Sequence, residues 1–359
     1  NEKIKLQRLQ NPRECMSKIG LPNRKYIDMN IFCDGTHHEA LAKSLQYLFE
    51  KRLRHKLFFP YGMEWFDSGN WLIGKPYGDS ARNTALQFLS GALPNDGTGV
   101  VAVPNKMTFE EFKNTHIDIV IASYYDHIDV YDALIKTYHP NAKLITQYGN
   151  EWPIHPKTRN LLASTAPMEI GSNINRCWYR EEFETNIYEP DNTERTNLIS
   201  CFSNAININS LFSKDWSDFL SLETLLPEYE FRSYGGGCRD GSLQEKNVAK
   251  TMKKSRFIYH GKENGDGYGF VVHQIACSGT PIIFKGHQYK GKLAGIFLED
   301  GKTGYDIDIR HLDGVVESLK TASNDEILAM GREIRQRFIQ NVNFDDDAHK
   351  VRDFLEILQ

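Results

Sequence analysis

The sequence of 359 residues has little of what would direct a chain to a membrane or to nucleic acid. It contains no apolar run that approaches the length needed to cross a bilayer. Its net charge is −4, so no overall positive field attracts nucleic acid or anionic lipid. The polar first residues do not resemble a secretory signal, although the sequence starts without Met. We expect a cytoplasmic protein without a membrane span.

The six cysteines show none of the close pairs, such as Cys-x-x-Cys, that typically bind metal. Several of them lie within or beside apolar segments that have the character of strands. We expect buried, reduced thiols, as in a cytoplasmic protein, and the sequence requires no metal site. The cysteines are Cys15, Cys33, Cys177, Cys201, Cys238 and Cys277.

Apolar strand patterns alternate with helical patterns along the chain, which is typical of α/β proteins. The length suffices for two domains of ordinary size. We predict two Rossmann-like domains that face each other across a cleft. The first is placed over residues 1–190, the second over 191–345, and a last helix over 346–359 that can cross back to the first domain. The boundary lies in the polar, mixed segment 166–195, which contains Pro190, Asp191, Asn192 and Thr193.

The first domain opens with a predicted strand at 26–33, a turn at Gly35, and a helix that begins at Thr36, where Thr36 and Glu39 form a capping-box pattern. Residues 60–98 are rich in Gly, Pro, Trp and Tyr. They either shape a binding cleft, because aromatic rings stack on sugars and bases, or form an irregular surface region.

Later strands and helices of both halves are predicted from the same patterns. Ligands bind at the carboxyl ends of strands in open parallel sheets, so residues 148–151 are expected to line the cleft. Residues 305–308 are predicted to be a half-buried strand rather than a metal-binding Asp-x-Asp. The expected strands are 56–59, 99–103, 117–123, 143–148, 161–164, 198–202, 229–234, 256–259 and 282–284, and the expected helices are 129–138, 216–226 and 243–254. Two more helices are expected to begin at Ser323 and after residues 345–347.

The segment 265–281 is the most informative part of the sequence. Alternate glycines precede an apolar helical pattern that begins at Phe270 and stops at Gly279. Glycine lets the backbone approach a ligand closely, because it has no Cβ. A helix that begins at such a loop presents unpaired N–H groups and a positive dipole end. The segment therefore predicts a site for an anionic or hydroxyl-rich ligand. The glycines are Gly265, Gly267 and Gly269.

The order of these residues resembles the signature of retaining glycosyltransferases of the GT-B fold, of the group 1 type. That signature has a glutamate, a Gly-aromatic-Gly turn, a second glutamate eight positions after the first, and a small-Gly-Thr-Pro stop. Asp266 and Gln274 hold the two glutamate positions here. The resemblance implies that Asp266 contacts the donor sugar and that Gln274 contacts the nucleotide ribose. It also implies that backbone N–H groups of Gly267, Tyr268, Gly269 and Phe270 face the sugar and phosphate.

Several residues depart from the family pattern. Asp reaches less far than Glu, and Gln bonds a ribose diol without charge assistance. The family also has an Arg and a Lys after the strand that corresponds to 198–202. Here Lys214 is the nearby cation, and the missing Arg is the most serious departure because its fork suits phosphate. Arg232 or Arg239 is an alternative.

The resemblance implies further contacts around the donor. Gly235 and Gly236 match the family's glycine-rich turn at the nucleotide. His260 and Lys262 are near the pocket in sequence, although solvated loop residues fit them equally. In the first domain, the turn with Gly35 and Thr36 would face the diphosphate and the acceptor. His37, or the adjacent His38, would contact phosphate or acceptor there, so His37 joins Asp266 as a candidate catalytic residue.

The resemblance implies a hexosyltransferase-type enzyme that moves a sugar from a nucleotide sugar to an acceptor, with retention, and without a metal or cofactor. A nucleotide-sugar epimerase of the same fold stays open, although it needs a set of carboxylates that the sequence does not place. A non-catalytic or nucleic-acid-binding relative, including a DNA-modifying glycosyltransferase, also stays open. The altered motif and the basic run 51–56 favour it, whereas the net charge and a solvated helix face oppose it. The sequence does not indicate the sugar, the acceptor (glycan, small molecule or modified nucleic acid) or the oligomeric state.

Overall fold

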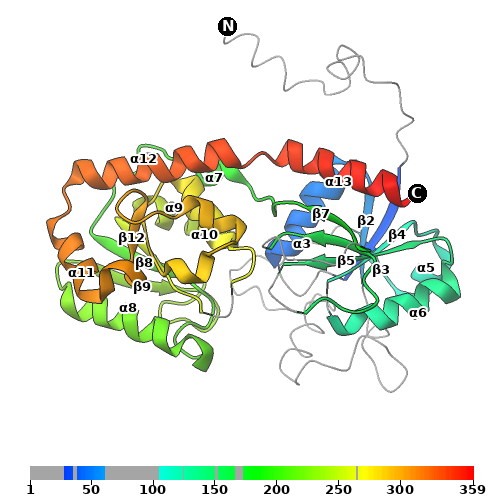
Figure 1. Ribbon diagram of the computed structural model, residues 1–359, viewed down its shortest axis with the longest axis horizontal. Helices are drawn as coiled ribbons and strands as arrows, with labels where there is room; N and C mark the ends of the chain where they lie inside the picture. Colours follow the sequence, from blue (N-terminus) through cyan, green and yellow to red (C-terminus); the bar gives the residue numbers. More distant parts are fainter. Residues whose placement is uncertain are drawn as a thin grey trace, which may run out of the picture.

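Figure 1 shows a computed structural model in which two parallel β-sheets, each covered by helices, lie side by side. One sheet is built from the first half of the chain and the other from the second half. The structure describes residues 28–34, 39–60, 105–123, 125–149, 153–165, 173–263 and 266–359.

The first sheet has seven strands in the order β3-β2-β1-β4-β5-β6-β7, and every pair is parallel. All four residues of the central strand β4 are buried, as expected where helices cover both faces of a parallel sheet. The strands are β1 (Asn30–Cys33), β2 (Lys56–Pro60), β3 (Lys106–Met107), β4 (Ile119–Ala122), β5 (Lys143–Tyr148), β6 (Asn160–Ala163) and β7 (Asn175–Trp178). The helical segments of this half are α3 (Glu39–Leu45), the π-helix η2 (Gln46–Arg52), α5 (Phe109–Asn114), η4 (Tyr125–His127) and α6 (Ile128–Tyr138).

The second sheet has five parallel strands in the order β12-β11-β10-β8-β9. Its strands are β8 (Leu198–Phe202), β9 (Glu230–Tyr234), β10 (Phe257–His260), β11 (Ile282–Phe284) and β12 (Gly304–Asp306). Its helices are α7 (Thr185–Tyr188), α8 (Ser213–Leu225), α9 (Glu245–Lys254), α10 (Phe270–Ser278), α11 (Ile307–Thr321) and α12 (Asn324–Asn341), with short 3-10 helices η5 (Ser210–Phe212), η6 (Gly286–Tyr289) and η7 (Leu293–Phe297).

The last helix, α13 (Phe344–Leu358), follows α12 along one edge of the molecule and lies over the first sheet (Figure 1). Val351, Phe354 and Leu355 belong to the same buried cluster as Ile31 of β1. Three acidic residues in its first turn match the positive end of the helix dipole, as predicted. The chain therefore returns to its first half at its end, while the predicted domain boundaries stay predictions.

Some elements differ from the sequence expectations. Residues 307–308 belong to helix α11 rather than to a strand, because the Asp306 carboxylate accepts the N–H of Asp308 and caps the helix. Strand β7 and helix α7 fall in a segment that the sequence suggested was only a polar linker. The capping box of Ser323 and Glu326 is confirmed.

Other expectations fall outside the described residues. These are the glycine-rich turn and helix start at 35–38, the aromatic region 61–98, and the strand 99–103. Part of the basic run can be judged: Arg52 donates to Glu182 at 2.7 Å and pairs with Asp345. Arg52 therefore joins η2 to the segment before α7 and to α13. The interpretation of the basic run as a solvated helix face was wrong for Arg52.

Candidate donor-binding site at the start of helix α10

The predicted helix α10 forms as expected, with glycines at both ends in the left-handed region. Gly269 has φ 75° and Gly279 has φ 66°. A Cβ on Gly269 would lie 2.6 Å from the Cβ of Ala294, so close packing also requires glycine there. No side chain caps the first turn of α10. Its N-terminal N–H groups therefore point toward a place where an anion is favoured.

The Asp266 carboxylate lies beside this helix start and is held by two donors. His260 Nε2 donates to Oδ2 at 3.0 Å, and the Tyr289 hydroxyl donates to the same oxygen at 3.0 Å. Lys292 Nζ donates to the Asp266 backbone carbonyl at 2.7 Å. The Asp266 side chain keeps 13% of its surface exposed. The carboxylate is thus fixed in position and still reachable by a ligand.

Asp266 is ionised at neutral pH. Burial opposes the charged form, but the hydrogen bond and charge of His260 and the charge of Lys262 outweigh it, so the pKa of Asp266 lies well below its usual range. A fixed, ionised carboxylate accepts hydrogen bonds strongly, including those from sugar hydroxyls.

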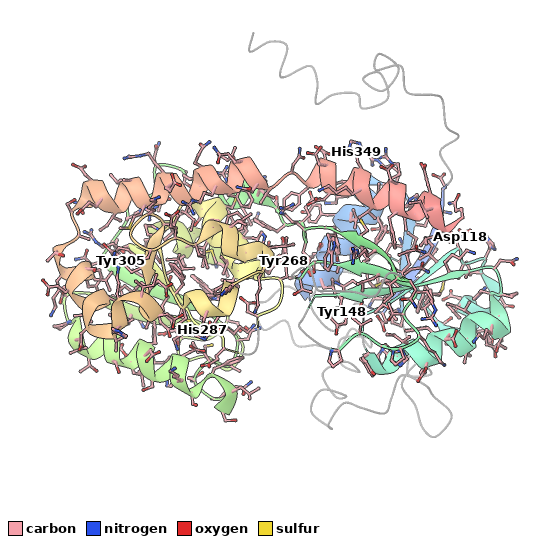
Figure 2. The ribbon with its side chains drawn as sticks, viewed as in Figure 1. Asp118, Tyr148, Tyr268, His287, Tyr305 and His349 are labelled. Carbon is pink, nitrogen blue, oxygen red and sulfur yellow. The ribbon has the colours of Figure 1, made fainter. Side chains whose placement is uncertain are left out.

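Tyr268 joins the two halves of the molecule. Its N–H donates to the Gly149 carbonyl at 3.0 Å, and its hydroxyl donates to the Glu181 carbonyl at 3.2 Å. Its ring stacks on His273 at 4.2 Å. Figure 2 shows Tyr268 on the side of the second sheet's domain that faces the first. The expectation that this N–H faces a ligand is wrong, because the carbonyl at the end of β5 takes it.

A second buried acid lies at the same junction. Glu181 is 6% exposed, and its Oε1 accepts the Ser164 hydroxyl at 2.6 Å. Burial raises the pKa of Glu181 to about 7, the Ser164 hydrogen bond lowers it, and the charge of Asp266 raises it further. Perturbed acids gather at functional sites more often than elsewhere, so this carboxyl group joins the candidate site.

We expect Glu181 to make stability fall as pH rises from about 4.5 to about 7. Its pKa is higher in the folded chain than its ordinary 4.5, so the folded state binds more protons in this range. His273, with its pKa lowered to about 4 by burial, acts in the opposite direction below pH 6.5. The two effects are separated by comparing wild type with Glu181→Gln. The variant should gain about 2–3 kcal/mol of unfolding free energy relative to wild type between pH 5 and pH 8. Parallel stability curves for the two proteins would contradict this.

Gln274 is buried, and its amide nitrogen donates to the Tyr188 hydroxyl at 2.7 Å. The amide group thus holds α7 against α10. The ribose contact implied by the resemblance stays a prediction, and the Gln274 side-chain oxygen is the atom that would make it.

The glycine-rich turn after β9 is closed by Asn204. Its Oδ1 accepts the N–H of Gly236 at 2.9 Å, and a Cβ on Gly235 would lie 2.6 Å from the same oxygen. Gly235 and Gly236 therefore lie at the carboxyl end of the sheet, next to the end of β8, where parallel sheets bind nucleotides.

The cations that the sequence suggested for the diphosphate differ in exposure and in their ion pairs. Lys214 is exposed in the first turn of α8. Arg232 pairs with Glu230 at 2.8 Å and Asp240 at 2.9 Å, and Arg239 pairs with Glu223 at 2.8 Å. The two arginines are therefore occupied by carboxylates.

The first half contributes less that can be described. Gly35, Thr36 and His37 lie outside the described residues. Asp34, immediately before them, accepts the N–H of Ser123 at 2.6 Å and the His127 Nδ1–H at 2.7 Å. The structure thus fixes where the chain enters the predicted glycine turn.

Sequence reasoning missed Glu181, Asp215, Tyr289 and Lys292, because none of them belongs to a local motif.

Within the described residues, no group of three or more His, Cys, Asp or Glu side chains is arranged to hold a metal ion. The five cysteines there are buried. None of the helices in this part of the chain is long and apolar enough to span a membrane.

Known proteins resemble this chain in fold but not in sequence. No model of a known protein family matches the sequence, and none of the curated proteins does. Solved structures do match. The HepE protein of Anabaena, in complex with UDP-glucose, has a TM-score of 0.62 at 11% identity over 92% of this chain and 100% of its own.

Two more matches have the same character. Sucrose-phosphate synthase of Thermosynechococcus elongatus has a TM-score of 0.61 at 12% identity over 92% of this chain and 99% of its own. A glycosyltransferase of Rickettsia africae has a TM-score of 0.59 at 11% identity over 92% of this chain and 98% of its own. At such identities the likeness shows the fold. The predicted GT-B architecture of two Rossmann-like domains is confirmed.

Proposed function

We propose that the chain is a glycosyltransferase that moves a hexosyl group from a nucleoside diphosphate sugar to an acceptor hydroxyl, with retention of configuration. The observation that carries the proposal is the ionised Asp266 beside the uncapped start of α10, at the junction of the two domains. The GT-B fold supports it, and so do the nucleotide sugars bound by similar structures, such as UDP-glucose in HepE.

The residues at this site have the properties that such a reaction needs. The Asp266 carboxylate would orient the donor by accepting its sugar hydroxyls. The N–H groups at the start of α10 would stabilise the charge that develops on the departing diphosphate. In retention by attack from the leaving-group side, a phosphate oxygen takes the acceptor's proton. This route therefore requires no protein base.

The proposal is tested with a panel of nucleotide sugars, by measuring nucleoside diphosphate release with and without candidate acceptors. We expect one donor to be turned over, with the same anomeric configuration in the product by NMR, and the matching nucleoside diphosphate to raise the melting temperature. No turnover of any donor, together with no thermal shift by any nucleotide, would reject an enzyme of this class.

A nucleotide-sugar epimerase is the second candidate. The observation in its favour is that the buried carboxyl group of Glu181 and the partly exposed one of Asp266 lie close enough for the charge of one to affect the other. An epimerase would convert the donor into its sugar epimer without any acceptor. Detection of that epimer in acceptor-free reactions would favour this candidate over transfer.

A further inference from the structure

The GT-B resemblance implies a phosphate-binding arginine shortly after β8, and this chain has none there. At the end of β8 the chain has Ser203 and Asn204, and Asn204 is committed to the turn at Gly236. Arg232 and Arg239 are paired with carboxylates, as described above. We therefore consider lysines on other elements of the same domain.

Lys285 carries a positive charge, but two carboxylates already bind it. It follows β11, is 1% exposed, and its Nζ lies 2.5 Å from Asp215 Oδ1 and 2.7 Å from Asp218 Oδ2. Two aspartates neutralise this ammonium group, and it is sealed from solvent. Lys285 is a structural cation.

Lys262 lies two residues beyond β10, which is the middle strand of the second sheet. Its charge contributes to lowering the pKa of Asp266. It also acts on Cys201 of β8, where burial raises the pKa of the thiol and the charge of Lys262 opposes this rise. Tyr259 of β10 lies opposite Cys201 of β8 in the parallel ladder, so Lys262 lies at the carboxyl edge of the sheet, just beyond the ends of both strands. The residue is partly exposed in a loop, whereas Lys285 is buried.

The loop that carries Lys262 is held from both sides. The N–H of Lys262 donates to Gln288 Oε1 at 3.0 Å, and the N–H of Glu263 donates to Asp215 Oδ2 at 2.8 Å. A Cβ on Gly261 would lie 2.7 Å from Asp215 Oδ1, so the loop rests directly on that carboxylate. The Asp215–Lys285 pair therefore serves as a fixed base for the loop.

We propose that Lys262 supplies the positive charge that binds the donor diphosphate, replacing the arginine that GT-B relatives carry after the strand corresponding to β8, and that Asp215 and Gln288 position it. This inference rests on the proposed function. It assigns the diphosphate to the space between the end of β8, the loop after β10 and the start of α10, beside Asp266.

The test compares the binding of uridine diphosphate, adenosine diphosphate and guanosine diphosphate with that of the corresponding nucleosides, by calorimetry. For the nucleotide that binds, Lys262→Ala should weaken affinity about 10- to 100-fold, since a hydrogen bond to a charged group contributes on that scale. The nucleoside should bind the variant and wild type equally. Lys262→Arg should restore most of the diphosphate affinity, and the exposed Lys320→Ala, the same charge change on α11, should leave it unchanged.

Each other outcome is decisive. Unchanged diphosphate affinity in Lys262→Ala overturns the assignment of Lys262 while leaving the proposed function intact, and so does a loss that follows Lys214→Ala instead. Equal loss of nucleoside and diphosphate, with a lowered melting temperature, shows a structural role and also overturns it. Failure of wild type to bind any nucleoside diphosphate, those of cytidine and thymidine included, overturns both the assignment and the proposed function.

Discussion

Replacing Asp266 with Asn is expected to lower donor turnover about 100- to 1,000-fold, the range seen when one preorganised electrostatic contact to a transition state is removed. The wild-type carboxylate is ionised and accepts from His260 and Tyr289 through one oxygen. The amide has no charge, and its nitrogen cannot accept a hydrogen bond. Both the orientation of the sugar and the local charge at the start of α10 would change.

The measurement is steady-state turnover of the donor found in the panel, with affinity for the free nucleoside diphosphate measured in parallel. Asp308→Asn is the matched control, because Asp308 is a carboxylate of the same domain that pairs with a histidine, His287, at 2.6 Å. Turnover should fall in Asp266→Asn while folding, judged by melting temperature, stays close to the control. Wild-type turnover in Asp266→Asn would remove this residue from the site.

Replacing Asp215 with Ala is expected to cost about 3–5 kcal/mol of unfolding free energy, as found when one partner of a buried ion pair is removed. Asp215 is completely buried and pairs with the buried ammonium group of Lys285. Its other oxygen satisfies the N–H of Glu263. The variant leaves the Lys285 charge with a single partner and also leaves a loop N–H unsatisfied.

Asp218→Ala provides the comparison for this prediction. It removes the other partner of Lys285, but the Asp218 side chain is 22% exposed, and water can replace part of the contact. We expect a loss of about 1 kcal/mol for Asp218→Ala in urea-induced unfolding. Equal losses in the two variants would mean that Asp215 is not the main support of Lys285.

The neighbourhood of helix α10 could be predicted because its signals are local. Gly269 and Gly279 adopt positive φ, the apolar run between them has helical length, and β11 follows at once. The start of α11 was misjudged for a local reason as well. Ile307 and Ile309 alternate with polar residues as in a strand, yet the Asp306 side chain caps a helix there.

The site itself depends on contacts that sequence order hides. Asp215 and Lys285 are 70 positions apart, Tyr268 and Glu181 are 87 apart, and the carbonyl that takes the Tyr268 N–H belongs to Gly149. A lone Asp, Glu or Lys in a sequence carries no sign of whether it will be buried or which charge it will meet. Burial and neighbouring charge set the state of an ionisable group, and both arise only when distant segments pack.

The sequence alone determined the alternation of strands and helices and the turn at the start of α10, and its resemblance to a known family implied the GT-B architecture with an acid beside an open helix end. Backbone preferences and hydrophobic spacing act over a few residues, so the order of amino acids contains them. Only the tertiary structure decided that the arginines are paired, that Gln274 binds Tyr188, and that Lys262 lies at the edge of the sheet, where its charge acts on Asp266. These facts follow from which segments meet, and that is settled by the packing of the whole chain.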